Sequence, residues 1–228
     1  MTSCAQVFVE NLNISVGGRE IIRGVSVDAG EGDVVCVFGV TGSGKTTFLK
    51  TLTGLVEAMY KGYEIEGEIC VHGYSPAEAL ARGLTAYVPQ DVYSFFIGSS
   101  VKEELVLLDV KDSVLLENIG VDIDKSLYTL SDGQLYRLLL ASAVAYGAKV
   151  VALDEPTSHV DWWSLHEVLN YLKEFAVDKG LTLFIADHRV NEVRRYCSKV
   201  LHLSSVEESC EIRRIRRGVV GDTVVLLK

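Results

Sequence analysis

The stretch Phe38–Phe48, which reads FGVTGSGKTTF, places three glycines within six positions and follows them with a lysine and two threonines. Before it, Val34–Val37 are apolar and mostly β-branched, as in a buried strand. Behind it, leucines recur at helical spacing, at Leu49, Leu52 and Leu55. A glycine-lined turn between a strand and a helix suits a polyphosphate, because the backbone can wrap the anion without Cβ clashes and the helix supplies unpaired N–H groups.

The spacing inside this turn is that of the Walker A motif: a glycine, four residues, a second glycine, a lysine and a threonine. Lys45 is predicted to reach the β- and γ-phosphates, and the Thr46 hydroxyl is predicted to ligate Mg²⁺. The chain is therefore expected to bind a nucleoside triphosphate. The predicted nucleotide-binding residues of the loop are Gly39, Val40, Thr41, Gly42, Ser43, Gly44, Lys45, Thr46 and Thr47.

Composition narrows the class of protein. With 228 residues, 48% of them hydrophobic, the chain can bury one sizeable core. Its formal net charge of −9 argues against nucleic-acid binding as the main role. The basic run Arg213–Arg217 is interpreted as a solvated edge, with a partner- or lipid-facing patch as the alternative. No signal peptide or apolar run of about 18 residues occurs, so the chain is not expected to span a membrane itself.

The five cysteines are scattered along the chain and form no Cys-x-x-Cys pair. Cys36 lies inside the predicted buried strand before the glycine turn. This distribution favours reduced thiols in a cytosolic protein over a disulfide framework or a metal site.

Short apolar runs alternate with helical patterns, which predicts an α/β fold with a parallel sheet. The candidate core strands are Val34–Phe38, Leu84–Val88, Val150–Leu153 and Leu181–Ala186. A separate antiparallel sheet is predicted from Gln6–Val9, Gly24–Val27 and Glu68–Val71. Helical patterns at Val101–Leu108 and Leu135–Ala145 predict an inserted helical lobe, and short strands are expected in the tail at Glu211–Ile215 and Thr223–Leu227.

The segment Val150–Pro156, VVALDEP, is an apolar strand that ends in two acids. A parallel strand delivers such residues to the same edge of the sheet as the glycine turn. Asp154 is predicted to hold Mg²⁺ through water, and Glu155 to orient and polarise the attacking water.

The segment Thr129–Arg137, TLSDGQLYR, is a capped helix start, with Ser131 as the N-cap. Its LSDGQ looks like the signature LSGGQ of ATP-binding-cassette (ABC) proteins, with Asp132 in place of the first glycine. Together with the two phosphate-site motifs, it makes the chain resemble the nucleotide-binding domain of that family. Asp132 is expected to point outward and to favour the helix dipole.

Further positions match the family in order. Gln90 resembles the Q-loop glutamine that reaches the metal and the attacking water. The segment Ser158–Asp161 resembles the D-loop, and His188 resembles the switch histidine at the γ-phosphate. Val16 stands where the family usually places an aromatic residue that stacks on adenine, so the resemblance predicts a weak base contact there.

The resemblance implies a fold and a mechanism. The fold would be a P-loop NTPase core with a parallel sheet, an N-terminal antiparallel β subdomain and an inserted helical subdomain. The whole chain, residues 1–228, would be one nucleotide-binding domain, with a core and β subdomain at about 1–90 and 148–228 and the helical subdomain at 91–147. Two such domains would enclose two ATP molecules with Mg²⁺, and each would complete its partner's site through the signature residues Ser131, Asp132, Gly133 and Gln134.

The leading interpretation is the ATP-hydrolysing subunit of an ABC transporter, bound to membrane-spanning subunits at the cytoplasmic face of the cell membrane. The segments Gln90–Leu107 and Asp187–Val193 resemble energy-coupling-factor importers, which take up vitamins and transition-metal ions. The apolar triplet Phe95–Ile97 could pack within the lobe or receive a helix of a membrane partner.

Other functions stay open to different degrees. The alternative is a soluble ABC ATPase without transport, such as one acting in iron–sulfur cluster assembly. A DNA-repair ATPase of the same superfamily is disfavoured, because no sustained heptads interrupt the domain. A non-enzymatic regulatory subunit is disfavoured because both Glu155 and His188 are present.

Overall fold

The computed structural model describes residues 6–107, 121–158, 160, 162–204 and 224–225. The strands are β1 (Val7–Val16), β2 (Arg19–Ala29), β3 (Val34–Phe38), β4 (Tyr63–Val71), β5 (Thr85–Val88), β6 (Val150–Asp154), β7 (Thr182–Ala186), β8 (Lys199–His202) and β9 (Val224–Val225). The α-helices are α1 (Lys45–Leu52), α2 (Leu55–Met59), α3 (Pro76–Ala81), α4 (Val101–Leu107), α6 (Asp132–Ala145), α7 (Trp162–Lys179) and α8 (Val190–Val193). Short 3-10 turns are η1 (Val92–Phe95), η2 (Leu127–Thr129) and η3 (Arg194–Tyr196).

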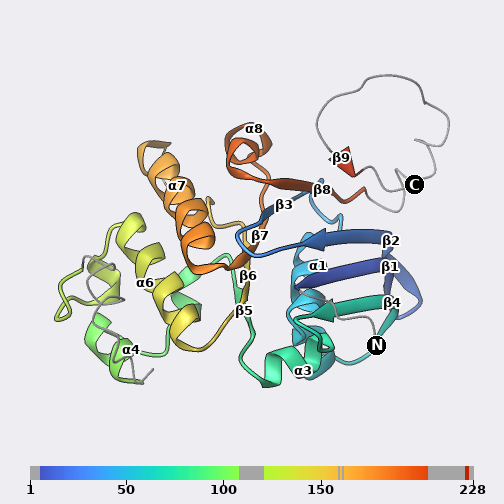
Figure 1. Ribbon diagram of the computed structural model, residues 1–228, viewed down its shortest axis with the longest axis horizontal. Helices are drawn as coiled ribbons and strands as arrows, with labels where there is room; N and C mark the ends of the chain where they lie inside the picture. Colours follow the sequence, from blue (N-terminus) through green and yellow to red (C-terminus); the bar gives the residue numbers. More distant parts are fainter. Residues whose placement is uncertain (1–5, 108–120, 159, 161, 205–223, 226–228) are drawn as a thin grey trace.

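The central sheet is parallel, with strand order β5-β6-β7-β3-β8-β9. Its strands β3, β6 and β7 are buried along their whole length, as expected for strands covered on both faces. Figure 1 shows α6 and α7 on one side of this sheet, while α1 and the strands β1, β2 and β4 lie on the other side. The predicted α/β class and the four predicted core strands are confirmed.

The second sheet is antiparallel, with order β2-β1-β4, and its existence was also predicted. Its strands are longer than the runs that the sequence pattern predicted. The pairing of β1 with β2 shifts register between Val9 and Leu12 and again before Ile14. Asn11, inside the first shift, has a φ of +49°. Such bulges break the alternation of apolar and polar residues on which the shorter predicted strands depend.

Two apolar cores lie on opposite faces of the central sheet, and β3 contributes to both. Val34, Cys36 and Phe38 belong to the core that includes α6 and α7. Val35 and Val37 belong to the core beneath the antiparallel sheet, which also includes α1. This division follows from the two-residue period of a strand. It holds the loop after Phe38 between two packed layers.

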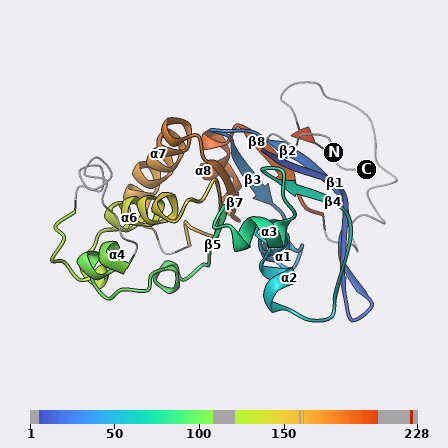
Figure 2. The same cartoon turned by 60° about the horizontal axis from the view of Figure 1, so that its bottom comes forward.

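Helices α4 and α6 lie between β5 and β6 in the sequence, although these two strands are neighbours in the sheet. The two helices form a lobe to one side of the sheet (Figure 2). The prediction for α4 is confirmed, although Leu108 lies outside the described residues. Helix α6 begins three residues earlier than its apolar pattern indicates, because its first turn is polar. Of the predicted tail strands, Glu211–Ile215 lies outside the described residues, and β9 occupies part of Thr223–Leu227.

The expectation of reduced cysteines is wrong for one pair. A disulfide joins Cys36 on β3 to Cys197, with Cα atoms 5.8 Å apart. The two residues are 161 positions apart in the chain, so their spacing gave no indication of a pair. They meet because Cys197 lies just before β8, which pairs directly with β3.

Candidate functional site

The glycine-rich loop lies between β3 and α1, where the sequence predicted it. Gly44 is the N-cap of α1 at a φ of +91°, and no side chain caps this helix end. A Cβ at Gly44 would also lie 3.0 Å from Ile21 and Ile22 side-chain atoms. The first N–H groups of a helix have no intrahelical acceptor, and at α1 no side chain caps them. The backbone at Gly44 adopts a conformation that a larger residue would resist.

Lys45 folds back over this loop. Its Nζ donates to the carbonyl oxygens of Gly39 at 2.9 Å and of Val40 at 3.2 Å, and the side chain is buried. An ammonium group held beside the unpaired N–H groups of a helix concentrates positive potential at this point.

A cavity of about 750 Å³ opens above the helix end. It is lined by Val16, Arg19, Glu20, Ile21, Thr41, Gly42, Gly44, Lys45, Thr46, Thr47 and Glu155. No aromatic ring is present among the described residues that line it. The cavity thus lies between the glycine-rich loop and the strand ends beside the turn between β1 and β2, and Val16 is among its lining residues. Arg19, Glu20 and Ile21 were missed, because they belong to a strand that has no motif of its own.

The two acids after β6 lie in different environments. Asp154 is the last residue of β6 and is 7% exposed, and its Oδ2 accepts a hydrogen bond from the Tyr87 hydroxyl at 2.9 Å. Burial and the nearby charge of Asp154 raise the pKa of the Tyr87 phenol above its ordinary value. Glu155 turns into the cavity, and its N–H donates to the carbonyl of Ala186 on β7.

Glu155 has a left-handed backbone, with a φ of +50°. That conformation costs a non-glycine residue about 1–2 kcal/mol, and it aims the residue away from the line of the strand. We expect Glu155→Gly to be about 1 kcal/mol more stable than Glu155→Ala, because both lose the carboxylate and only glycine relieves the backbone. Urea unfolding of the two variants measures the difference. An alanine variant as stable as the glycine variant, or more stable, would contradict this expectation.

His188 follows β7 and is more than half exposed. Its Nδ1 lies 3.8 Å from Glu155 Oε2 and 3.8 Å from Asp187 Oδ1. The sequence-predicted acid and histidine are therefore neighbours across the ends of β6 and β7.

Two residues that sequence reasoning missed hold these strand ends together. Asp187 is fully buried and accepts a hydrogen bond from Thr157 Oγ1 at 2.6 Å and from the Arg189 N–H at 2.8 Å. A carboxylate directly after an apolar strand, next to His188, was the available signal.

The remaining predicted residues do not line the cavity. Ser131 caps α6 in a capping box with Gln134: the Ser131 hydroxyl accepts from the Gln134 N–H, and Gln134 Oε1 accepts from the Ser131 N–H. Asp132 occupies the first turn, and Gly133 follows it. Gln90 is exposed, two residues beyond β5. Asp161, the predicted D-loop residue, lies outside the described residues.

The P-loop, the acidic strand end and the parallel sheet define a P-loop nucleotide-binding domain. A family model described as ABC transporter matches residues 22–158. The chain belongs to the ABC transporter family. The resemblance stated from the sequence motifs is therefore confirmed.

Similar proteins agree with this family. The chain is 30% identical over 209 residues to an ABC transporter ATP-binding protein of Streptomyces avermitilis, covering 84% of this chain and 37% of that one. It is 28% identical over 224 residues to the methionine import ATP-binding protein MetN of Chlamydia abortus, covering 89% of this chain and 64% of that one. The chain thus spans less than two thirds of the length of these relatives.

Among solved structures, CbiO1 of Clostridium perfringens has the same fold, with a TM-score of 0.75 and 24% identity over 92% of both chains. CbiO1 is described as part of the ABC transporter complex cbiONQ. Within the described residues of the present chain, every helix is too short or too polar to span a membrane.

Proposed function

We propose that the chain is the subunit of an ABC importer that binds and hydrolyses ATP. The observation that carries the proposal is the cavity, in which Lys45 and the uncapped end of α1 face Glu155. Donors for a triphosphate and an acid for the attacking water thus share one site. Release of phosphate by the purified chain with Mg²⁺ and ATP tests the activity, and the absence of release, alone and in its complex, would contradict it.

The residues present fit Mg²⁺. The Thr46 hydroxyl and the Gln90 amide would supply hard oxygen donors of the kind that this ion prefers, and the Asp154 carboxylate would hold it through water. When bound, Mg²⁺ neutralises charge on the phosphates. Asp154 would act at the strand end, Thr46 at the start of α1, and Gln90 from the segment after β5.

Each group of the chain has a distinct role in the proposed reaction. Lys45 and the N–H groups at the start of α1 hold the phosphates. Glu155 polarises the attacking water, and His188, beside it, donates to the γ-phosphate. The Thr157–Asp187 bond keeps the ends of β6 and β7 together, so that Glu155 and His188 act on the same phosphate.

A second subunit is part of the proposal. Ser131 and its neighbours lie on α6, outside the cavity that they would serve. A second chain facing the first head to tail would bring its own α6 terminus to the open side of the cavity. Donors around the γ-phosphate would then come from both chains.

The proposed membrane partner would dock near the lobe. Phe95 and Phe96 are half-buried against the core, so the packing interpretation fits these two residues. Ile97 is 66% exposed and remains available to a partner at the cytoplasmic face of the membrane. The likeness to CbiO1 and the motif after Gln90 support an energy-coupling-factor importer, with a vitamin or a metal ion as cargo. Co-purification with a membrane protein would separate this function from a soluble iron–sulfur ATPase.

The base contact should be weak, because Val16 offers apolar contact but no π-face. We expect ATP and GTP to bind within about tenfold of each other, a gap of ~1.4 kcal/mol or less. Val16→Tyr should tighten ATP binding about fivefold or more, since a base–aromatic stack is worth about 1–3 kcal/mol. Titration with slowly hydrolysed analogues in Mg²⁺ measures both.

A hundredfold preference for ATP would contradict this expectation and would point to another aromatic ring. Tyr63 is the cross-strand partner of Val16, and Phe8 is exposed on β1. Tyr63→Leu and Phe8→Leu would then identify the ring, because only the variant that lost the stack would lose the preference.

A further inference from the structure

The carboxylate of Asp154 has a neighbour that the nucleotide-binding motifs do not include. Tyr87 lies on β5, the strand beside β6, and its hydroxyl is 2.9 Å from Asp154 Oδ2. An ionised carboxylate only accepts hydrogen bonds, so the phenol is the donor. Among the described residues, no hydrogen bond is made to the other carboxylate oxygen, Oδ1.

The strand register explains why the two side chains meet. Tyr87 pairs with Ala152 in the parallel ladder of β5 and β6. Ala152 and Asp154 lie on the same face of β6, because alternate residues of a strand share a face. The Ala152 side chain is only a methyl group, so the phenol can extend along this face to the carboxylate at the strand end.

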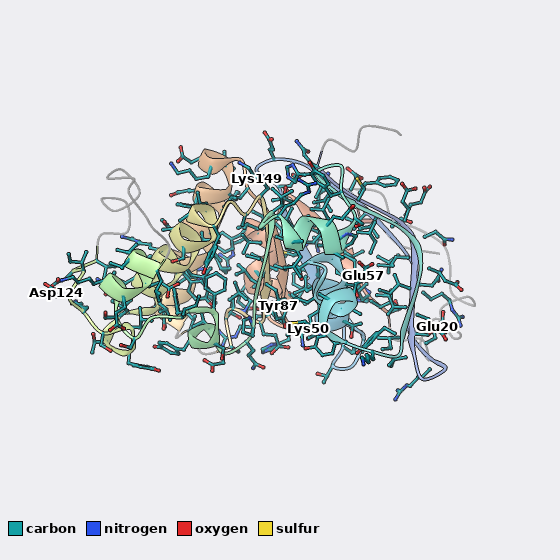
Figure 3. The ribbon with its side chains drawn as sticks, turned by 90° about the horizontal axis from the view of Figure 1, so that it is seen from below. Glu20, Lys50, Glu57, Tyr87, Asp124 and Lys149 are labelled. Carbon is teal, nitrogen blue, oxygen red and sulfur yellow. A yellow bond between two sulfur atoms is a disulfide. The ribbon has the colours of Figure 1, made fainter. Side chains whose placement is uncertain are left out.

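Helix α1 also contacts the Tyr87 ring. Lys50 Nζ on α1 lies 5.6 Å from the centroid of the Tyr87 ring and 5.1 Å from that of Tyr60, and it donates to the Tyr60 hydroxyl at 3.1 Å. Figure 3 labels Tyr87 and Lys50 next to each other. The hydroxyl of this half-buried ring, which α1 contacts, is directed at Asp154.

We propose that Tyr87 is a positioning residue for Asp154, whose carboxylate it holds in place for its role at the Mg²⁺ site. The inference rests on the proposed function, in which Asp154 helps to hold the cation that accompanies ATP. A hydrogen-bond partner restricts the rotation of a carboxylate that holds a metal through water, and losing an outer-shell partner of a metal site typically weakens metal binding or activity about 10- to 100-fold. A bond that only tied β5 to β6 would not change the dependence on the cation.

Tyr87→Phe in the full chain tests the inference, since it removes the hydroxyl and keeps the ring. A fluorescent, slowly hydrolysed ATP analogue is titrated in EDTA and again at rising Mg²⁺. The Kd in EDTA should stay within about twofold of the unaltered chain. The Mg²⁺ concentration that gives half of the cation-dependent tightening should rise about 10-fold.

Two variants make the test specific. Tyr60→Phe loses a hydroxyl from the same aromatic cluster without a bond to Asp154, and its Mg²⁺ midpoint should not move. Adding Tyr87→Phe to Asp154→Asn should change nothing further, because the effect of Tyr87 acts through that carboxylate.

An unchanged Mg²⁺ midpoint in Tyr87→Phe, or an equal loss of affinity with and without Mg²⁺, would overturn the role of Tyr87. An additional shift of the midpoint in the Asp154→Asn background would overturn it too. If the unaltered chain bound no nucleotide, the proposed function would fall together with this inference.

Discussion

Glu155→Gln should lower ATP turnover by about 100- to 10,000-fold and leave nucleotide binding intact, because a general base typically contributes that much. The Glu155 side chain lines the cavity, and its Oε2 lies 3.8 Å from His188 Nδ1. Glutamine keeps the size and one acceptor of the glutamate but cannot polarise water as a carboxylate does. With hydrolysis blocked, ATP should hold the variant as a dimer.

Phosphate release and nucleotide titration measure the two effects separately. Glu57→Gln is the matched control, since Glu57 is an exposed acid on α2 that does not line the cavity. It should keep turnover within about twofold of the unaltered chain, as surface substitutions usually do. Near-normal turnover in Glu155→Gln, alone or in its full complex, would remove Glu155 from the proposed role.

The second large effect concerns the two chains of the proposed dimer. Lys45→Ala removes the ammonium group from the P-loop, and Ser131→Arg places a bulky cation at the cap of α6. Each variant should be nearly inactive alone. Mixed in equal amounts, they can form a dimer in which one composite site has every group intact. Statistical exchange then restores up to about a quarter of the unaltered activity.

The outcome of mixing depends on which ATP Ser131 serves. If Ser131 completed the site of its own chain, neither site of the mixed dimer would be intact and mixing would restore nothing. Gel filtration with ATP, in the Glu155→Gln background, reports whether the chains self-associate. A chain that stayed monomeric there would contradict a homodimer and indicate an unlike partner.

Sequence patterns predicted best where burial was complete. The strand at Val34–Phe38 was predicted with its observed bounds, because both of its faces are apolar. The strands of the antiparallel sheet were predicted too short, since the bulge near Asn11 interrupts their alternation. A one-dimensional pattern contains the period of a strand but not the places where pairing shifts.

The same limit applies to the site. The P-loop lies where its motif predicted, and Glu155 and His188 are neighbours. Tyr87 was missed because, within an apolar strand, it looks like a core residue, and its partner Asp154 is 67 positions away. The Thr157–Asp187 bond and the Cys36–Cys197 disulfide likewise join residues that only the folded sheet brings together.

The left-handed backbone of Glu155 has a consequence for how this position evolves. A residue that costs the fold about 1–2 kcal/mol persists only where selection for activity outweighs selection for stability. In a descendant that still bound nucleotide but no longer hydrolysed it, the acid would lose its advantage. Glycine or asparagine would then accumulate at position 155. The residue found there would indicate whether a lineage still hydrolyses the nucleotide.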